Sequence, residues 1–404
     1  MEEHDSTRQV RRSEFIALIA MMLAIVALSV DAMLPAMPSI AADLQLSDPQ
    51  RASLILTSFL VGLGIATFFT GPISDAFGRR PVVFVGLLIY AIGALWAWYA
   101  QSLESMLAAR VLQGIGAAGP RVVSAAIVRD RYSGAQMASI MSFALMLFLI
   151  IPALAPMLGA WITMVSNWRM IFATFVLFSI LLITWFGMRQ PETLPVEQRR
   201  PIKLRSLLDA LSQIFSHPTT RLSICVQTLS MTVLFSVLTM VQPIFDITFG
   251  RADNFPYWFG AIAFLSGVSS FLNARIVERL GMRCLVTWAL RSQIVISSAT
   301  LILLLMNVPG AFWIYLVWQL GVMLQVGFTT ANLNSMAMEP MGHIAGTASS
   351  VIAGTTMIGG AALASILAPL FDGTPVPITC ISLTCVCLSL VIMAAMRRAE
   401  GALV

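Results

Sequence analysis

Asp31 and Arg110 are charged residues inside long apolar stretches of this 404-residue chain. Asp31 is the sole carboxylate placed deep within any such stretch. Low-dielectric surroundings disfavour the charged form of a carboxyl group, so Asp31 is a candidate to load and release a proton. The alternative is a capping residue at a helix end that Pro35 disturbs.

Arg110 lies about two helical turns inside a second stretch, where an arginine costs at least ~2.5–3.5 kcal/mol on insertion scales. We expect it to bias the ionisation of Asp31 and to couple it to a bound substrate; a purely structural intramembrane ion pair is the alternative. Six polar side chains are candidates to line a cavity: Gln113, Arg121, Gln227, Gln242, Arg291 and Asn332. Uncharged members of such a set more often make interhelical hydrogen bonds.

Arg121 and Arg291 bear on the charge of a bound compound. If both face the cavity, its positive potential favours anionic, zwitterionic or electron-rich neutral compounds over lipophilic cations. Arg291 could instead snorkel towards the membrane interface, and Arg121 could pair with a backbone carbonyl.

A short connector brings glycines and charges together: Gly71, Asp75, Gly78, Arg79 and Arg80. Glycines permit a tight turn, and a carboxylate can pair with guanidinium groups across helix ends. The spacing predicts a latch between helices, although an ordinary basic loop with incidental glycines is the alternative.

The composition indicates which elements position these residues. The chain is 58% hydrophobic and 11% charged, against about 25% charged in soluble domains. Soluble enzymes, nucleic-acid-binding domains and disordered scaffolds are therefore poor interpretations. Since about 20 residues span a bilayer, we predict twelve spans: 15–36, 52–72, 81–101, 104–128, 136–161, 168–187, 222–245, 255–275, 284–306, 311–333, 344–370 and 375–396.

Basic residues predict the orientation of these spans. One set of loops carries most of them: Arg8, Arg11, Arg12, Arg79, Arg80, Arg129, Arg131, Arg189, Arg199, Arg200, Lys203, Arg205, Arg221, Arg275, Arg279, Arg283, Arg397 and Arg398. The opposite set has only Arg51, Arg169 and Arg251. Because basic loops stay on the cytoplasmic side, both termini should be cytoplasmic.

A repeat divides the chain into two halves. The connector that ends in Gly78 and Arg79 has a weaker echo at Gly281 and Arg283, after the eighth span, as expected of a two-bundle protein. The predicted fold is therefore an all-α polytopic membrane protein with two six-helix bundles. Its parts are a tail at 1–14, bundles at 15–188 and 222–396, a linker at 189–221 and a tail at 397–404; Lys203 to Phe215 could form an amphipathic surface helix.

Cysteines and histidines suggest no metal, cofactor or enzyme chemistry. Five cysteines lie in or beside apolar runs without framework spacing. The three histidines lie in the tail or in predicted loops, and no span carries a Ser/His constellation.

Several of these motifs resemble those of the major facilitator superfamily. The connector Gly71–Arg80 resembles its loop between spans two and three, and Arg110–Gly119 resembles its span-four motif. Asp31 with Pro35 is similar to an Asp-x-x-x-Pro pattern of its drug exporters. Pro152, Pro156 and Gly159 in span five resemble the antiporter motif, but Ala155 replaces the usual glycine, and a merely kinked packing helix remains an alternative.

Two C-terminal stretches narrow the resemblance. Leu272–Gly281 and Asn332–Ser349 look like the Bcr/CflA branch of bacterial drug-resistance antiporters. Ala331 stands where that branch often has proline.

The resemblance implies a transporter of the bacterial inner membrane that exports small amphiphilic compounds, such as bicyclomycin, amphenicols or sulfonamides, in exchange for protons. Asp31 would carry the proton, and Asp75 with Arg79 would latch the cytoplasmic gate. The alternative is a proton symporter that imports a small organic acid or another metabolite. The expected partners are the substrate, protons and the lipid bilayer, without nucleic acid, cofactor or metal, and the protein is expected to be a monomer.

Overall fold

The computed structural model describes residues 11–148, 150–199 and 204–401. Helices joined by short connections make up these residues, and no strand occurs among them. Residues 1–10 and 402–404 of the predicted tails, and Lys203 of the predicted surface helix, lie outside the described residues. Eleven helices within these ranges are long and apolar enough to cross a membrane. The predicted all-α membrane fold is confirmed.

The first half of the chain contains α1 to α8. Their bounds are α1 (Arg12–Asp31), α2 (Met37–Asp43), α3 (Leu54–Phe77), α4 (Arg79–Tyr99), α5 (Leu103–Arg131), α6 (Gly134–Phe148), α7 (Ile150–Val165) and α8 (Arg169–Arg189). The predicted span 136–161 falls on α6 and α7 together, and the first span continues from α1 through a 3₁₀ turn (Leu34–Ala36) into α2.

The second half contains α9 to α15. Their bounds are α9 (Leu204–Ser216), α10 (Pro218–Pro243), α11 (Phe255–Leu280), α12 (Met282–Leu305), α13 (Ala311–Met338), α14 (Ala345–Leu367) and α15 (Val376–Gly401). Helix α11 is not one of the eleven membrane helices counted above, but it covers the predicted span 255–275. Helices are expected here because a membrane supplies no water to satisfy backbone polar groups.

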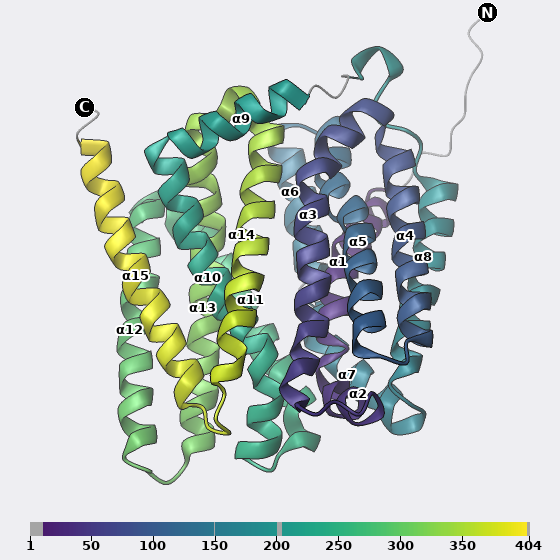
Figure 1. Cartoon of the computed structure of the whole chain (residues 1–404). Helices are drawn as coiled ribbons and strands as arrows, with labels where there is room; N and C mark the ends of the chain where they lie inside the picture. Colours follow the sequence, from purple (N-terminus) through teal and green to yellow (C-terminus); the bar gives the residue numbers. More distant parts are fainter. Residues whose placement is uncertain (1–10, 149, 200–203, 402–404) are drawn as a thin grey trace, which may run out of the picture.

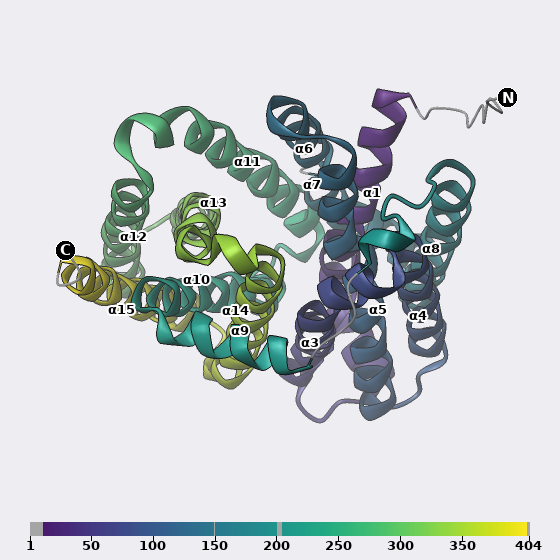
Figure 2. The ribbon, with the colours of Figure 1, turned by 90° about the horizontal axis from the view of Figure 1, so that it is seen from above.

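The helices form two groups that stand side by side (Figures 1 and 2). One group contains α1 to α8, and the other contains α10 to α15. The start of α1, the end of α15 and α9 lie at the same end of the molecule in Figure 1, which we call the linker end; the other is the opposite end. The two groups meet where α3 packs against α14 and where α7 packs against α11.

Small residues allow the helices of the first half to pack closely. A Cβ atom added to Gly114 of α5 would lie 2.1 Å from the carbonyl oxygen of Phe59 in α3. Side chains larger than hydrogen therefore do not fit, and the two backbones touch.

Helix α9 lies across the linker end, over α10 and α14 (Figure 1). Its Ile214 is fully buried and packs with Ile224 and Ile352. The apolar face of this amphipathic helix thus rests, at Ile214, on the second half of the protein rather than on lipid.

Candidate functional site

Asp31 is the last residue of α1, and 6% of its surface is exposed. No hydrogen bond or ion pair to its carboxylate exists within the described residues. Burial without a partner is expensive for a charged group and much less so for a neutral one. The position therefore suits a carboxyl group that exchanges a proton.

Arg110 is fully buried in α5 and makes its contacts with neutral groups. Its Nη2 donates to the Ser29 carbonyl over 3.0 Å, its Nη1 to Gln113 Oε1 over 2.7 Å and its Nε to the Ile55 carbonyl over 3.3 Å. Its guanidinium carbon lies 4.5 Å from the ring centroid of Phe59, a cation–π contact.

These contacts argue against the alternative for Arg110, a purely structural intramembrane ion pair. No carboxylate among the described residues pairs with it, so it does not form an intramembrane ion pair with Asp31. Instead it attaches α5 to the backbone of α1 two residues before Asp31. The hydrogen bond from Arg110 to the Ser29 carbonyl therefore links the position of Arg110 to that of the α1 segment that carries Asp31.

Sequence reasoning missed Tyr90 and Ser29 at this site. The Tyr90 hydroxyl of α4 lies 2.6 Å from Ser29 Oγ, and both residues are fully buried. A tyrosine in the middle of a predicted span was the available signal, because a buried hydroxyl needs a hydrogen-bond partner.

The proline-containing helix α7 packs directly against the segment that follows Asp31. A Cβ atom on Gly159 would lie 1.8 Å from the carbonyl oxygen of Ala32. Pro156 is buried in the helix, and Pro152 lies in its first turn. The antiporter-like motif thus places its glycine beside the buried acid.

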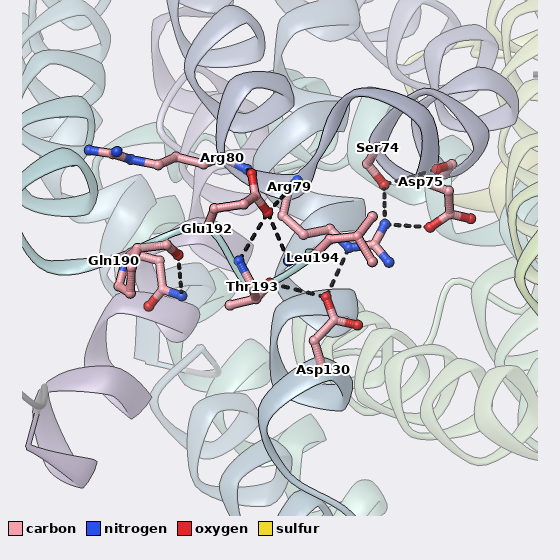
Figure 3. Close-up of polar contacts among 11 residues, drawn as sticks. Ser74, Asp75, Arg79, Arg80, Asp130, Gln190, Glu192, Thr193 and Leu194 are labelled. Atoms are coloured by element: carbon pink, nitrogen blue, oxygen red, sulfur yellow. Dashed lines mark hydrogen bonds and ion pairs between the residues drawn. The ribbon is translucent and has the colours of Figure 1, made fainter. Parts of the chain in front are cut away.

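The charged connector forms a cluster at the linker end, shown in Figure 3. Arg79 pairs with Asp75 of α3 over 2.5 Å and with Asp130 of α5 over 3.0 Å, and its Nη1 also donates to Ser74 Oγ over 2.7 Å. The predicted pairing of Asp75 and Arg79 is present. Asp130, which the sequence interpretation did not select, joins a third helix to the pair.

Glu192 of the linker completes this cluster (Figure 3). Its carboxylate accepts hydrogen bonds from the backbone N–H groups of Arg79 (2.9 Å), Arg80 (3.0 Å), Thr193 (2.9 Å) and Leu194 (3.0 Å). Burial by itself would raise the pKa of Glu192, but these backbone hydrogen bonds lower the pKa below its usual value. The first turn of α4 is thereby fixed to the linker.

Two other members of the connector have separate contacts. Arg80 Nη2 donates to the Gly187 carbonyl at the end of α8 over 2.7 Å. Gly71 faces the other half, where a Cβ atom would lie 2.8 Å from Ser350 Oγ of α14. The charges thus link helices of the first half, while Gly71 contacts the second.

The two glycines of the predicted repeat have the same backbone conformation. Gly78 separates α3 from α4 with φ of 103°, and Gly281 separates α11 from α12 with φ of 80°. Positive φ is accessible to glycine at little cost, which explains the residue type at both turns. Arg283 is exposed, so the echo reproduces the turn without the buried arginine of the first half.

Two cavities open between the halves towards the opposite end. One of about 800 Å³ is bordered by Met157 and Trp161 of α7 and by Asp246 and Asp253 of the second half. The other, of about 130 Å³, lies between Leu56 and the segment around Gln242. Gln242 borders both cavities.

The remaining cavity candidates occupy different places. Gln113 Oε1 accepts a hydrogen bond from Arg110 of the same helix in the first half. Asn332 Nδ2 of α13 donates to Asn273 Oδ1 of α11 over 2.6 Å, an interhelical hydrogen bond within the second half. Gln227 is buried in α10. Arg121 is half-buried between the halves, with its Nη1 3.9 Å from Met357 Sδ of α14.

The structure corrects the expectation that Arg291 lines the cavity. It is exposed on α12, a helix that packs against α11, α13 and α15, all in the second half. It therefore does not line the cavities described between the halves. Helical periodicity alone did not reveal which face of α12 is turned outward.

Within the described residues, eleven membrane-crossing helices and α11 stand in two groups, with a buried acid inside the first group and cavities between the two. This arrangement defines a membrane transporter of the two-bundle type. The chain belongs to the Major Facilitator Superfamily, whose family description matches residues 19–365. It is a multi-pass transporter and not an enzyme.

Relatives agree with the resemblance to the Bcr/CflA branch. The chain is 30% identical over 364 residues to a bicyclomycin resistance protein homolog of Haemophilus influenzae, across 89% of this chain and 90% of the relative. It is 28% identical over 370 residues to multidrug resistance protein D of Escherichia coli, across 89% and 90%.

A solved structure agrees with the fold. A D-xylose-proton symporter matches with a TM-score of 0.70 at 14% sequence identity, over 93% of this chain and 95% of that chain. At this identity the likeness shows the fold alone.

Proposed function

We propose that this chain exports small, partly apolar compounds in exchange for protons, as a monomer in the bacterial inner membrane. One relative is named as a bicyclomycin resistance protein homolog and another as a multidrug resistance protein, which supports export of drugs. Amphenicols and sulfonamides are candidate substrates because of the resemblance to the Bcr/CflA branch. The observation that carries the proton part is the buried carboxyl group of Asp31, which has no partner among the described residues.

In this proposal, loading a proton onto Asp31 removes an uncompensated charge from the packed interior of the first half. Charge in such surroundings is expensive, so protonation changes which helix packing is most stable. Two contacts carry the change outward. Arg110 holds the Ser29 carbonyl on one side of Asp31, and Gly159 of α7 touches the Ala32 carbonyl on the other.

The cluster around Arg79 acts in this proposal as the gate at the linker end, which is the cytoplasmic side because basic residues concentrate there. Its ion pairs bind α3, α4 and α5 into one unit, and Gly71 of α3 touches α14. Rocking of the two halves would open and close this contact while the charged cluster moves as a rigid body.

Substrate would leave in this proposal through the cavity of about 800 Å³ at the opposite end. Pockets for drug-sized ligands have volumes of roughly 300–1,000 Å³ and mostly apolar walls with a few polar groups. Met157, Trp161 and Tyr257 supply the apolar surface here, and Gln242 supplies a polar one.

Everted membrane vesicles that contain the full chain test the proposal. An imposed proton gradient, acid inside, should drive uptake of a panel of labelled amphenicols, sulfonamides and bicyclomycin, and added drug should release protons. The variant Asp31→Asn should insert normally, yet reduce proton-coupled uptake at least about tenfold, because an amide cannot carry the proton.

Asp209→Asn is the matched control, because it removes an exposed carboxylate from α9 outside the two groups of helices. It should transport like the wild type. Wild-type proton coupling in Asp31→Asn would refute the role of Asp31. Proton-driven accumulation of an organic acid in right-side-out vesicles, without drug uptake in everted ones, would refute export.

A further inference from the structure

Arg291 lies on the outer surface of the second half, more than two turns inside α12 from the end at Met282. An arginine facing lipid at this depth is unfavourable unless its guanidinium reaches the interface. In a helix the Cα–Cβ bonds tilt towards the N-terminus. The N-terminus of α12 is at the linker end, so the side chain of Arg291 leans towards that end.

Arg291 shares a surface cavity of about 280 Å³ with two further arginines. Arg283 belongs to the first turn of α12, and Arg397 lies near the end of α15. Eight residues separate Arg283 from Arg291, which is about 12 Å at 1.5 Å per residue. The cavity therefore extends along the groove between α12 and α15, from the linker end towards the membrane interior.

The residues that line this cavity combine positive charge with apolar surface. No carboxylate is among the lining residues that the structure describes, and Trp288 and Met393 line the cavity together with the arginines. Trp288 is 66% exposed. Tryptophans are enriched at membrane–water interfaces, where their rings sit at the level of the head groups. A phosphate group would pair with the arginines, while a hydrocarbon chain attached to it would lie along the tryptophan.

We propose that this cavity binds the phosphate of an anionic phospholipid, such as phosphatidylglycerol or cardiolipin, in the leaflet at the linker end. Basic pockets between membrane helices on the cytoplasmic side suit such head groups. Guanidinium groups bind phosphate oxygens through paired hydrogen bonds. The apolar surface of Trp288 favours a lipid over free phosphate, since inorganic phosphate has no chain to place there.

Native mass spectrometry of the purified full-length protein in detergent tests this site. Phosphatidylglycerol should remain bound at lower concentrations than phosphatidylcholine. Each basic residue near an anionic surface contributes about fivefold in affinity, so Arg291→Gln should weaken phosphatidylglycerol binding by about that factor. Arg291→Lys keeps the positive charge and should retain most of the preference for phosphatidylglycerol over phosphatidylcholine. A loss in Arg291→Gln alone would then be due to the missing charge and not to misfolding.

Arg398→Gln is the matched control, because Arg398 is exposed on the same helix as Arg397 but does not line the cavity. It should bind lipid like the wild type. Equal phosphatidylglycerol binding in the wild type and Arg291→Gln would overturn the site. Displacement of the lipid by inorganic phosphate at comparable concentrations would overturn the assignment to a lipid.

Discussion

Arg110 is a buried cation whose partners are carbonyl oxygens, an amide and an aromatic ring. Three N–H groups of one guanidinium point to three different oxygens on α1, α3 and α5. Hydrogen bonds that involve a charged group contribute about 1.5–3 kcal/mol each. The planar fork therefore holds the three helices in register around Ser29, next to Asp31.

Arg110→Lys should disrupt this arrangement although it conserves the charge. A lysine has a single ammonium group and cannot reach three separated acceptors in one plane. We expect proton-coupled transport to fall about tenfold or more, and the pH dependence of transport to change. The measurement is the rate of drug uptake in everted vesicles over a series of external pH values.

Arg51→Lys, at an exposed position at the opposite end, is the control for this substitution. If Arg110→Lys transports with the rate and pH profile of the wild type, the fork geometry has no role in coupling. The residue would then be only a structural charge, the alternative that its sequence position leaves open.

At the scale of elements, the contact between α7 and the segment after α1 depends on Gly159, because a glycine has no side chain to keep the two backbones apart. The backbone of α7 approaches Ala32 so closely that a methyl group on Gly159 would overlap its carbonyl oxygen. We expect Gly159→Ala to displace α7, to destabilise the protein by about 1–3 kcal/mol as overpacking does, and to reduce transport strongly.

The thermal unfolding midpoint and the vesicle transport rate measure these two effects. Gly346→Ala in the first turn of α14 is the control, because an added Cβ atom there meets no atom within 4 Å. It should leave both quantities near their wild-type values. A fully active Gly159→Ala would show that the close approach of α7 is incidental.

The linker is attached to α4 by the carboxylate of Glu192, which can be protonated by lowering the pH. The pKa of Glu192 is below its usual value of 4.5 in the folded protein, since its carboxylate accepts four backbone N–H groups. A depressed pKa means that Glu192 stabilises the fold fully above its unfolded pKa. This stabilisation is lost as the pH falls from about 4.5 through the folded pKa.

Glu192→Gln should therefore lower the unfolding midpoint at pH 7, and the difference from the wild type should shrink as the pH falls below about 4.5. Thermal unfolding followed by tryptophan fluorescence measures it. Glu197→Gln, an exposed neighbour in the linker, should show no such pH-dependent difference. A constant difference between pH 7 and the acid range would contradict the proposed anchoring by the carboxylate.

At the scale of the whole molecule, charges are distributed unequally along the boundary between the halves. Arg121 lies half-buried between α5 and α14, whereas the cavity at the opposite end carries Asp246 and Asp253. We expect Arg121→Gln to weaken transport of acidic compounds more than that of neutral ones, because it removes the positive potential near the centre of this boundary.

Competition between acidic, neutral and cationic compounds for transport measures this preference. Arg291→Gln now serves as the control, since Arg291 lies on the outer surface, and it should leave the preference unchanged. Good export of ethidium-like cations, together with an unchanged preference in Arg121→Gln, would refute a selective role for Arg121.

The amino-acid sequence alone predicted the helical membrane fold, the two halves and the burial of Asp31 and Arg110. These properties depend on local composition: an apolar run of about 20 residues must become a helix in a bilayer. A glycine before a basic residue marked the turns at Gly78 and Gly281. The pairing of Asp75 with Arg79 was accessible because the two residues are only four positions apart, on either side of the tight turn at Gly78.

Only the tertiary structure decided which of the polar residues meet. Asp130 and Glu192 join Arg79 from segments distant in sequence. Arg110 binds backbone carbonyls rather than Asp31, and Arg291 faces outward. The physical reason is that hydropathy is nearly the same on the lipid-facing and protein-facing sides of a membrane helix, since lipid tails are as apolar as the protein interior. Packing between helices, which no single stretch of sequence encodes, therefore selects the face each side chain occupies.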